Sequence, residues 1–228
     1  DLTIKLFGLP INIKKKYYSS IYGPTLKNKT GYYAVRTPAT KEIRALEQWW
    51  RMNKATSFSA FYDILKMKAL PGYNIGYADK NDTIFYISNG LIPKRAEGYD
   101  WANVVPGNTR KTLWEETYDT EELPQVIQPP SGYFYNANHS PFLSSADEDN
   151  PDGDLFSLDM GFERYDNNRS TRLKALIEAE EKLSYEDFKR IKYDHTLPTP
   201  MVFSWMDINH LFALQADKYP DIAFLIQR

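Results

Sequence analysis

Residues 75–88 read IGYADKNDTIFYIS, and this stretch decides the fold class of the chain. Two runs rich in apolar and aromatic residues flank Lys80, Asn81 and Asp82, which is typical of two strands joined by a short turn. Parallel strands cannot be joined this way, because they need a crossover connection of a dozen or more residues. The stretch therefore predicts an antiparallel hairpin over residues 75–79 and 83–88.

Upstream of this hairpin the sequence predicts strands and then two helices. Residues 2–6, 17–22 and 31–37 alternate like strands, with turns at 23–24 and 28–31. Thr40 and Ser57 can each cap a helix that presents one apolar face. The face of the first helix would be formed by Ile43, Leu46, Trp49 and Trp50.

Downstream of the hairpin lies a long Pro-rich connection over residues 89–131, followed by a predicted strand at 133–138 and an acidic loop at 147–154. Helices are expected from Asn168, after Ser184 and over residues 203–216. The order of elements is that of an α+β protein with antiparallel sheets and a helical C-terminal segment. We divide it into residues 1–142, with the sheets, the helix pair and the long loop, and residues 143–228, with the acidic loop and helices.

Composition excludes several classes of function. The formal net charge of −2 gives no basic field for nucleic acid, and no apolar run approaches the roughly 18 residues of a membrane span. The chain has no cysteine, which rules out disulfides, thiolate metal sites and cysteine nucleophiles. The excess is in aromatic residues, at 15% of the chain, which suggests a large core or an aromatic-lined pocket.

The three histidines, His139, His195 and His210, show no metal-ligand spacing, and we interpret them as solvated or helix-terminal residues. A serine triad lacks the Gly-x-Ser-x-Gly turn that would support it. The acidic loop holds five carboxylates between residues 147 and 154. It has two interpretations, a solvated loop or a calcium site that uses part of a degraded EF-hand-like pattern.

Residues 129–141, PPSGYFYNANHSP, form the most specific stretch. On a strand, Asn136 and Asn138 would point to the same face. Buried carboxamides need hydrogen-bond partners, so a pair of them beside a Gly and a Pro is poor packing material. Either they cap turns, or a side-chain NH₂ donates to a developing oxyanion.

Several motifs occur in an order that resembles the β-chain of the penicillin acylase family, which includes acyl-homoserine lactone acylases. YGPTL at 22–26 and YYAVR at 32–36 resemble its His-Gly-Pro and Tyr-Ala-x-Arg strands, with Tyr22 in place of the usual His. NIGYAD at 74–79 and GLIP at 90–93, followed by Arg95, resemble a second pair. Trp114 through Leu123-Pro124, and then residues 132–141, resemble a third. The resemblance spans nearly the whole chain and implies part of an αββα sandwich of the N-terminal-nucleophile hydrolases.

The resemblance also implies roles for six residues. Asn138 falls on the oxyanion-hole asparagine and Arg169 on the arginine that positions the active site, with Arg172 as the alternative in register. Trp50 and Tyr73 align with positions that line the acyl pocket, although Trp50 could equally belong to the core. Asp154 falls on a calcium-ligating aspartate of some members and Trp101 on a residue that offers the ion a backbone carbonyl. The loop before Asp154 is longer here than in the penicillin G acylases. No organic cofactor is implied.

The family's nucleophile is the N-terminal serine of the β-chain, which is exposed when the precursor matures by self-cleavage. The present chain begins with Asp1 at a point that resembles the interior of that β-chain. We therefore expect a piece of a longer precursor that is inactive alone and whose partners are the remaining α- and β-chain parts and a small amide substrate. Periplasmic or secreted localisation is implied by the resemblance. The alternative is a non-catalytic, aromatic-rich module that binds sugars or peptides.

Overall fold

The structure is a computed structural model that describes residues 2–14, 16–40, 42–203 and 208–227. It forms two compact units that alternate along the sequence. The first unit comprises Asp1–Tyr73, Asn89–Leu123 and Ser157–Gly161, and the second comprises Asn74–Ser88, Pro124–Phe156 and Phe162–Arg228. The division between residues 142 and 143 is a different one and stays a prediction. None of the helices in the described ranges has the length and apolar character needed to cross a membrane.

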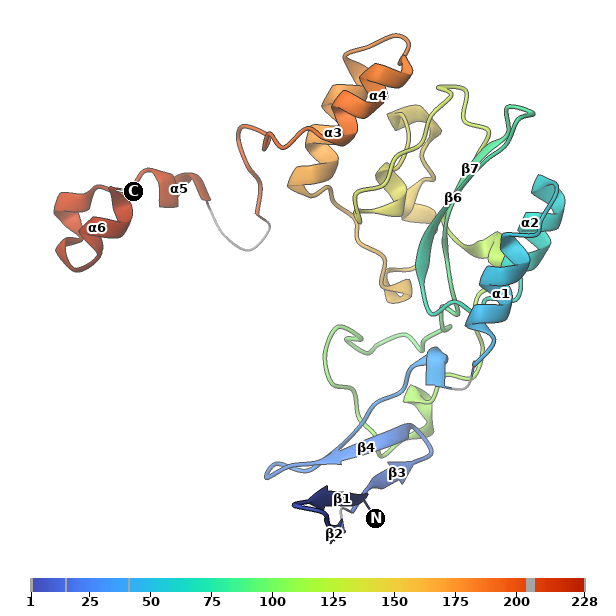
Figure 1. Cartoon of the computed structure of the whole chain (residues 1–228), viewed down its shortest axis with the longest axis vertical. Coiled ribbons are helices and arrows are strands. Elements are labelled where there is room, and N and C mark those ends of the chain that lie inside the picture. The colour runs from blue at the N-terminus through green and yellow to red at the C-terminus, as the bar shows by residue number, and fades with distance from the viewer. Residues whose placement is uncertain (1, 15, 41, 204–207, 228) are drawn as a thin grey trace. The chain divides into compact units, whose positions relative to one another are not determined.

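The second unit is built on a three-stranded sheet in the order β6-β7-β8, which Figure 1 shows with β6 (Tyr73–Ala78) beside β7 (Ile84–Asn89). β7 is the middle strand, and its antiparallel partner on the other side is β8 (Gln125–Ile127). Phe85, Tyr86 and Ile87 of β7 are almost completely buried, so both faces of this middle strand are covered. β8 lies inside the connection that we expected to lack strands.

The predicted hairpin is confirmed, and one side chain organises its turn. Asp79 Oδ1 accepts hydrogen bonds from the backbone N–H of Asn81 (2.8 Å) and of Thr83 (3.2 Å). Asp82 has a φ of 59°, a left-handed conformation that aspartate tolerates better than most residues. The hydrogen bonds of Asp79 and the conformation of Asp82 therefore explain why the chain turns between these two strands.

The first unit begins with two small antiparallel sheets. β1 (Leu2–Leu6) pairs with β2 (Leu9–Ile13), and β4 (Gly23–Lys27) lies between β3 (Tyr18–Ser20) and β5 (Tyr32–Ala34). The turn at 28–31 is confirmed, with Asn28 Oδ1 accepting the N–H of Thr30 and Gly31. The turn expected at 23–24 is wrong, since these residues begin β4, and β2 was not predicted.

Helix α1 (Ala45–Met52) differs from the prediction in its start. Thr40 ends a short 3-10 helix instead of capping α1, and Arg44 occupies the N-cap. Figure 1 shows α1 beside α2 (Phe58–Leu65), which starts after Ser57 as predicted, with the Ser57 hydroxyl accepting the N–H of Ala60. The four residues predicted to share one face of this helix are exposed: Ile43, Leu46, Trp49 and Trp50.

The buried residue of α1 is Gln48, whose exposed fraction is 0%. Its Oε1 accepts hydrogen bonds from the backbone N–H of Ala69 (2.6 Å) and Leu70 (3.1 Å). Since buried N–H groups must be paired, this side chain satisfies two donors that no regular element serves. A polar residue therefore attaches α1 to the chain that follows α2.

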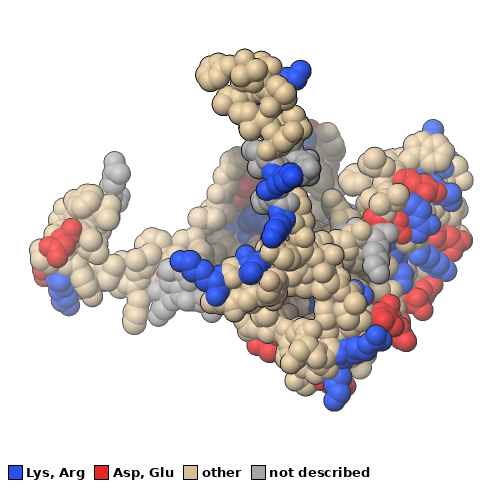
Figure 2. Space-filling model, turned by 90° about the horizontal axis from the view of Figure 1, so that it is seen from below, with Lys and Arg blue, Asp and Glu red and all other residues tan. Residues whose placement is uncertain are grey.

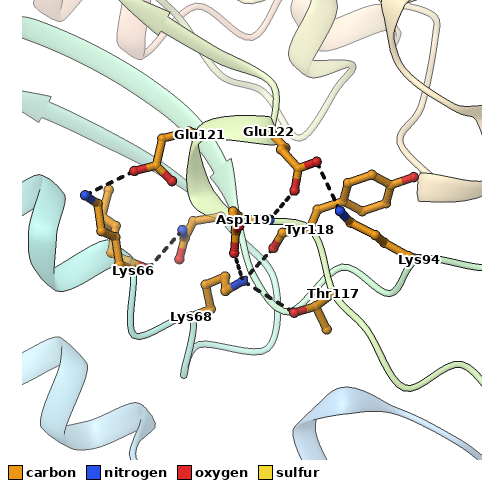
Figure 3. Close-up of polar contacts among 10 residues, drawn as sticks. Lys66, Lys68, Lys94, Thr117, Tyr118, Asp119, Glu121 and Glu122 are labelled. Atoms are coloured by element: carbon orange, nitrogen blue, oxygen red, sulfur yellow. Dashed lines mark hydrogen bonds and ion pairs between the residues drawn. The ribbon is translucent and has the colours of Figure 1, made fainter.

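Three lysines attach residues 117–122 to other parts of the first unit (Figure 3). Lys66 at the end of α2 pairs with Glu121 (3.1 Å), and Lys94 pairs with Glu122 (3.1 Å). Lys68, the least exposed of the three, donates to the carbonyl of Tyr118 and to Asp119. Exposed ion pairs add little stability each, so the part-buried bond of Lys68 to a backbone carbonyl is the most important of these contacts.

The second unit ends in helices. α3 (Asn168–Glu178) and α4 (Tyr185–Lys192) confirm two predictions, and Ser184 caps α4 by accepting the N–H of Asp187. The helix expected over 203–216 is shorter, because α5 spans Ile208–Phe212; residues 204–207 lie outside the described ranges. A last short helix, α6, spans Ala223–Ile226. Strands and helices in this arrangement confirm the α+β class with antiparallel sheets.

Charged side chains are of both signs on the visible surface. In Figure 2, Lys and Arg lie interspersed with Asp and Glu on the right of the face shown, and uncharged surface predominates. This is the distribution that a formal net charge of −2 suggests. It offers no broad basic field on that face of the kind that holds a phosphate backbone.

Candidate functional site

The segment around Asn138 is not a strand, so the prediction for residues 133–138 is wrong. Residues 133–136 have no regular secondary structure, the chain bends at Ala137 and Asn138, and Asn138 has a φ of 54°. Asn136 Oδ1 accepts the backbone N–H of Asn138 (3.1 Å), a local bond with which asparagine favours turns over strands. The strand alternation that placed Asn136 and Asn138 on one face therefore does not apply.

His139 holds this turn from the inside. Its exposed fraction is 3%, its Nδ1 accepts the N–H of Ala137 (3.1 Å) and its Nε2 lies 2.8 Å from the carbonyl oxygen of Leu143. Both bonds form together when the ring is neutral with the proton on Nε2. The ring stacks on Tyr135 at a centroid distance of 4.9 Å. His139 is thus a buried structural residue and not the solvated histidine that we expected.

The side chain of Asn138 is exposed and held at one end. Its Oδ1 accepts a hydrogen bond from Arg169 Nη2 (3.3 Å), and within the described ranges its Nδ2 has no hydrogen-bond acceptor. A guanidinium can only donate, so its bond to Oδ1 fixes which end of the carboxamide faces the arginine. The NH₂ group is left as a free donor directed away from Arg169.

Arg169 reaches Asn138 from the first turn of α3. A cation is unfavourable there, because the helix macrodipole favours negative charge at the N-terminus by about 0.3–1 kcal/mol. Arg172, the alternative, binds Asp194 through Nε (3.1 Å) and Nη2 (2.9 Å). These bonds to Arg172 lower the pKa of Asp194 to about 2. Arg169, not Arg172, therefore contacts Asn138.

Asn136 contacts the sheet and not Arg169. Its Nδ2 donates to the phenol oxygen of Tyr86 (3.1 Å), on the buried middle strand β7. Burial raises the pKa of Tyr86, so this phenol stays neutral. Asn136 thus connects the turn to the sheet, and Asn138 carries the exposed amide.

The two residues expected to line an acyl pocket belong to the first unit. Trp50 on α1 is 62% exposed and Tyr73 is 46% exposed, so neither is a core residue of the described chain. Tyr73 makes an edge contact with Trp49, the neighbour of Trp50, at 6.0 Å between ring centroids. Together with Leu46 they form an apolar, solvent-facing area, which we call the α1 face.

Three of the five carboxylates of the acidic loop form ion pairs or hydrogen bonds within the protein. Asp147 forms an ion pair with Lys174, Asp149 accepts the N–H of Ser131 (2.8 Å), and Asp152 accepts the N–H of Asp154 (3.0 Å). Across the described ranges, no three His, Asp or Glu residues gather as a metal site would require. Asp154 offers one exposed carboxylate, whereas Ca²⁺ takes six to eight oxygen ligands.

Trp101 lies in the first unit and uses its ring nitrogen within its own loop, where Nε1 donates to the carbonyl of Ala96 (2.9 Å). No donor set for Ca²⁺ follows from this contact. The described residues therefore do not by themselves fit a calcium site at Asp154, and calcium stays a prediction.

Comparison with known proteins identifies the family. The family model described as penicillin amidase matches residues 3–208. The chain belongs to the penicillin amidase family. It is 33% identical over 156 residues to penicillin G acylase of Escherichia coli, a match that covers 68% of the chain and 17% of that protein.

Two further proteins are similar to this member of the penicillin amidase family. Acyl-homoserine lactone acylase PvdQ of Pseudomonas syringae is 27% identical over 90 residues, which are 36% of the chain and 12% of that protein. A solved penicillin G acylase of Alcaligenes faecalis superposes with a TM-score of 0.65 at 20% identity, covering 83% of the chain and 33% of the solved one. The chain thus has the penicillin acylase type of fold, and it spans a small part of the length of each relative.

Within this penicillin amidase fold, two residues beside Asn138 were missed by sequence reasoning. His139 was set aside, although a histidine directly after a turn-forming asparagine can be buried beneath the turn. Asn167 was not considered, although asparagine before a helix, with Ser170 three residues on, is a capping pattern. Both signals are local, and neither by itself indicates a contact with Asn138.

Proposed function

We propose that the whole protein is an amidohydrolase that cleaves linear amides, such as the acyl side chain of a β-lactam or of an acyl-homoserine lactone. Family membership supports an acylase-related amide hydrolase. The relatives named for penicillin G and for acyl-homoserine lactones suggest the two substrate classes. The observation that carries the site is the bond from Arg169 to Asn138 Oδ1, which leaves Asn138 Nδ2 free to donate.

In this proposal the nucleophile is an N-terminal serine outside the present 228 residues. Its oxygen attacks the amide carbonyl while its own α-amine takes the proton and passes it to the leaving nitrogen, so that an amine departs and an ester remains. Water, deprotonated by the same amine, then attacks the ester carbonyl; the bond to the serine oxygen breaks, this oxygen takes the proton from the amine, and the carboxylic acid is released. Asn138 Nδ2 donates to the oxyanion formed in each step. These 228 residues alone would be inactive.

Trp50 and Tyr73 are proposed to contact the acyl group in the whole protein. Exposed aromatic rings of the α1 face suit an apolar acyl chain or an aryl ring. Turnover of a panel of amides, from phenylacetyl to long-chain acyl amides, tests the substrate class. Hydrolysis of none of them by the matured whole protein would reject the proposed function. Periplasmic or secreted localisation belongs to the same proposal and is tested by cell fractionation.

Replacing Arg169 with Met should lower kcat of the matured whole protein by about tenfold or more. Without the guanidinium nothing fixes the orientation of the Asn138 carboxamide, and a misplaced catalytic group can lose up to about a hundredfold in rate. Steady-state kinetics with a chromogenic amide would measure this.

The matched control is Arg172→Met, on the same helix and with the same change of charge. It removes the bonds to Asp194 and should lower the melting temperature with little change in kcat. Equal losses of kcat in the two variants would show that the effect comes from the helix or its charge and not from Asn138.

Calcium is tested by stability. If the whole protein completes a site at Asp154, millimolar calcium should raise its melting temperature, since an ion present at a hundred times its Kd adds about 2.7 kcal/mol. Asp154→Asn should abolish that increase, whereas Asp217→Asn should retain it. A melting temperature that calcium leaves unchanged would reject the assignment of Asp154 and Trp101 to a calcium site.

A further inference from the structure

Asn167, the N-cap of α3, uses both ends of its side chain. Its Oδ1 accepts the backbone N–H of Arg169 (3.0 Å) and of Ser170 (3.0 Å), which is the capping interaction. Its Nδ2 donates to the carbonyl oxygens of Ala137 (3.0 Å) and Asn138 (3.1 Å). One carboxamide therefore connects the start of α3 to the turn that carries Asn138.

The NH₂ group of Asn167 has no part in capping. An N-cap needs an acceptor for the N–H groups of the first turn, and Asp or Ser supplies one as well as Asn does. A residue that also donates is required by the two carbonyl groups of the turn. The choice of asparagine at this position is thus explained by the Asn138 turn and not by the helix.

These bonds determine where the free amide of Asn138 lies. Asn138 has a φ of 54°, a conformation that is less favourable for L-residues than the extended or helical ones. The donor from Asn167 holds the peptide groups on either side of it, and Arg169 holds its side chain. Because Asn167 also binds the N–H of Arg169, the backbone of Asn138 and the arginine that orients its amide are fixed to the same side chain.

We propose that Asn167 is a positioning residue that sets the oxyanion donor of Asn138 through its NH₂ group. The inference rests on the proposed function, in which Asn138 Nδ2 stabilises the oxyanion. Loss of the two bonds to the turn would let the peptide of Asn138 relax. A displacement of about 1 Å costs up to about a hundredfold in rate.

The test uses Asn167→Asp and Asn167→Ser in the matured whole protein. Both variants keep a capping acceptor and lose the NH₂ donor, so α3 stays capped and the loss of melting temperature should be limited to that of the two bonds to the turn. We expect kcat to fall by about 10- to 100-fold and KM to change by less than about threefold, because the oxyanion exists only in the transition state. Serine is neutral, so agreement of the two variants separates the lost donor from an added charge.

Asn168→Asp is the matched control, the same substitution one residue further on. Asn168 Nδ2 donates to the carbonyl of Val202 (3.0 Å), and its Oδ1 accepts the N–H of Val202 (2.8 Å), away from the Asn138 turn. This variant should retain kcat. If the precursor of an Asn167 variant does not mature, the rate of self-cleavage followed by mass spectrometry replaces kcat as the readout, with the same control.

The outcomes separate the inference from the proposed function. If Asn138→Ala abolishes turnover while both Asn167 variants keep kcat within about twofold, the inference is wrong and the proposed function stands. If Asn138→Ala retains turnover, the assignment of the oxyanion donor fails, and the role of Asn167 fails with it. A loss of kcat in Asn168→Asp as large as that in the Asn167 variants would also overturn the inference.

Discussion

Asn138→Ala in the matured whole protein should lower kcat by about 100- to 1,000-fold, the usual effect of removing one oxyanion donor. KM should change much less, because the charge that Nδ2 would stabilise is absent from the bound substrate. Single-turnover and steady-state kinetics on one amide measure both quantities. Near-normal turnover by this variant would show that Asn138 is not the oxyanion donor.

Two further variants show whether the effect comes from the amide. Alanine is strained at the φ of 54° that Asn138 adopts, whereas glycine is not, so Asn138→Gly removes the side chain and leaves the backbone relaxed. Equal losses of kcat in the Ala and Gly variants would attribute the effect to the missing donor. Asn136→Ala removes the bond to Tyr86 and should mainly lower stability. An Asn136 variant that loses turnover as completely as the Asn138 variant would contradict the roles given to both.

Gln48→Leu should be strongly destabilising, although it replaces a polar residue with an apolar one in a buried place. The substitution leaves the N–H groups of Ala69 and Leu70 without an acceptor, and each unpaired buried donor costs about 1–3 kcal/mol. We expect a total of about 2–6 kcal/mol, measured as a loss of melting temperature and of denaturation midpoint in the whole protein.

The control for Gln48 is its neighbour on α1. Glu47 is paired with Arg51 at 2.6 Å in an exposed position, and the loss of such a pair typically changes stability by less than about 1 kcal/mol. Glu47→Ala should therefore melt close to the wild type. If Gln48→Leu melts as high as Glu47→Ala, the two bonds of Gln48 are not important for the stability of α1.

Local signals predicted the elements that depend on a few neighbouring residues. The hairpin around residues 80–82 and the caps at Ser57 and Ser184 were predicted because a side chain or turn within four residues determines each of them. α1 shows the limit of this reasoning. Periodicity indicates which residues share a face of a helix, but not which face the rest of the chain covers. Here the covered face is the one with Gln48, because its side chain accepts two backbone N–H groups.

The site shows a similar limit. Asn138 and Arg169 were singled out by the family motifs, but their bond joins residues 31 apart, and no spacing rule predicts it. The strand expected at 133–138 was wrong because Asn136 and His139 bind backbone N–H groups locally, which propensities for strands do not include. Asn167 could be recognised as a cap from sequence, but its second pair of bonds is visible only once the turn is placed.

The α1 face has a thermodynamic consequence. Trp49 and Trp50 are more than half exposed and lie near Tyr73 and Leu46, so apolar surface here is still hydrated. At about 25 cal/mol per Å², removing some 200 Å² of it from water would release about 5 kcal/mol, comparable to the net stability of a small domain. Any surface that covers the α1 face is then linked to folding by mass action, and its concentration would shift the melting temperature.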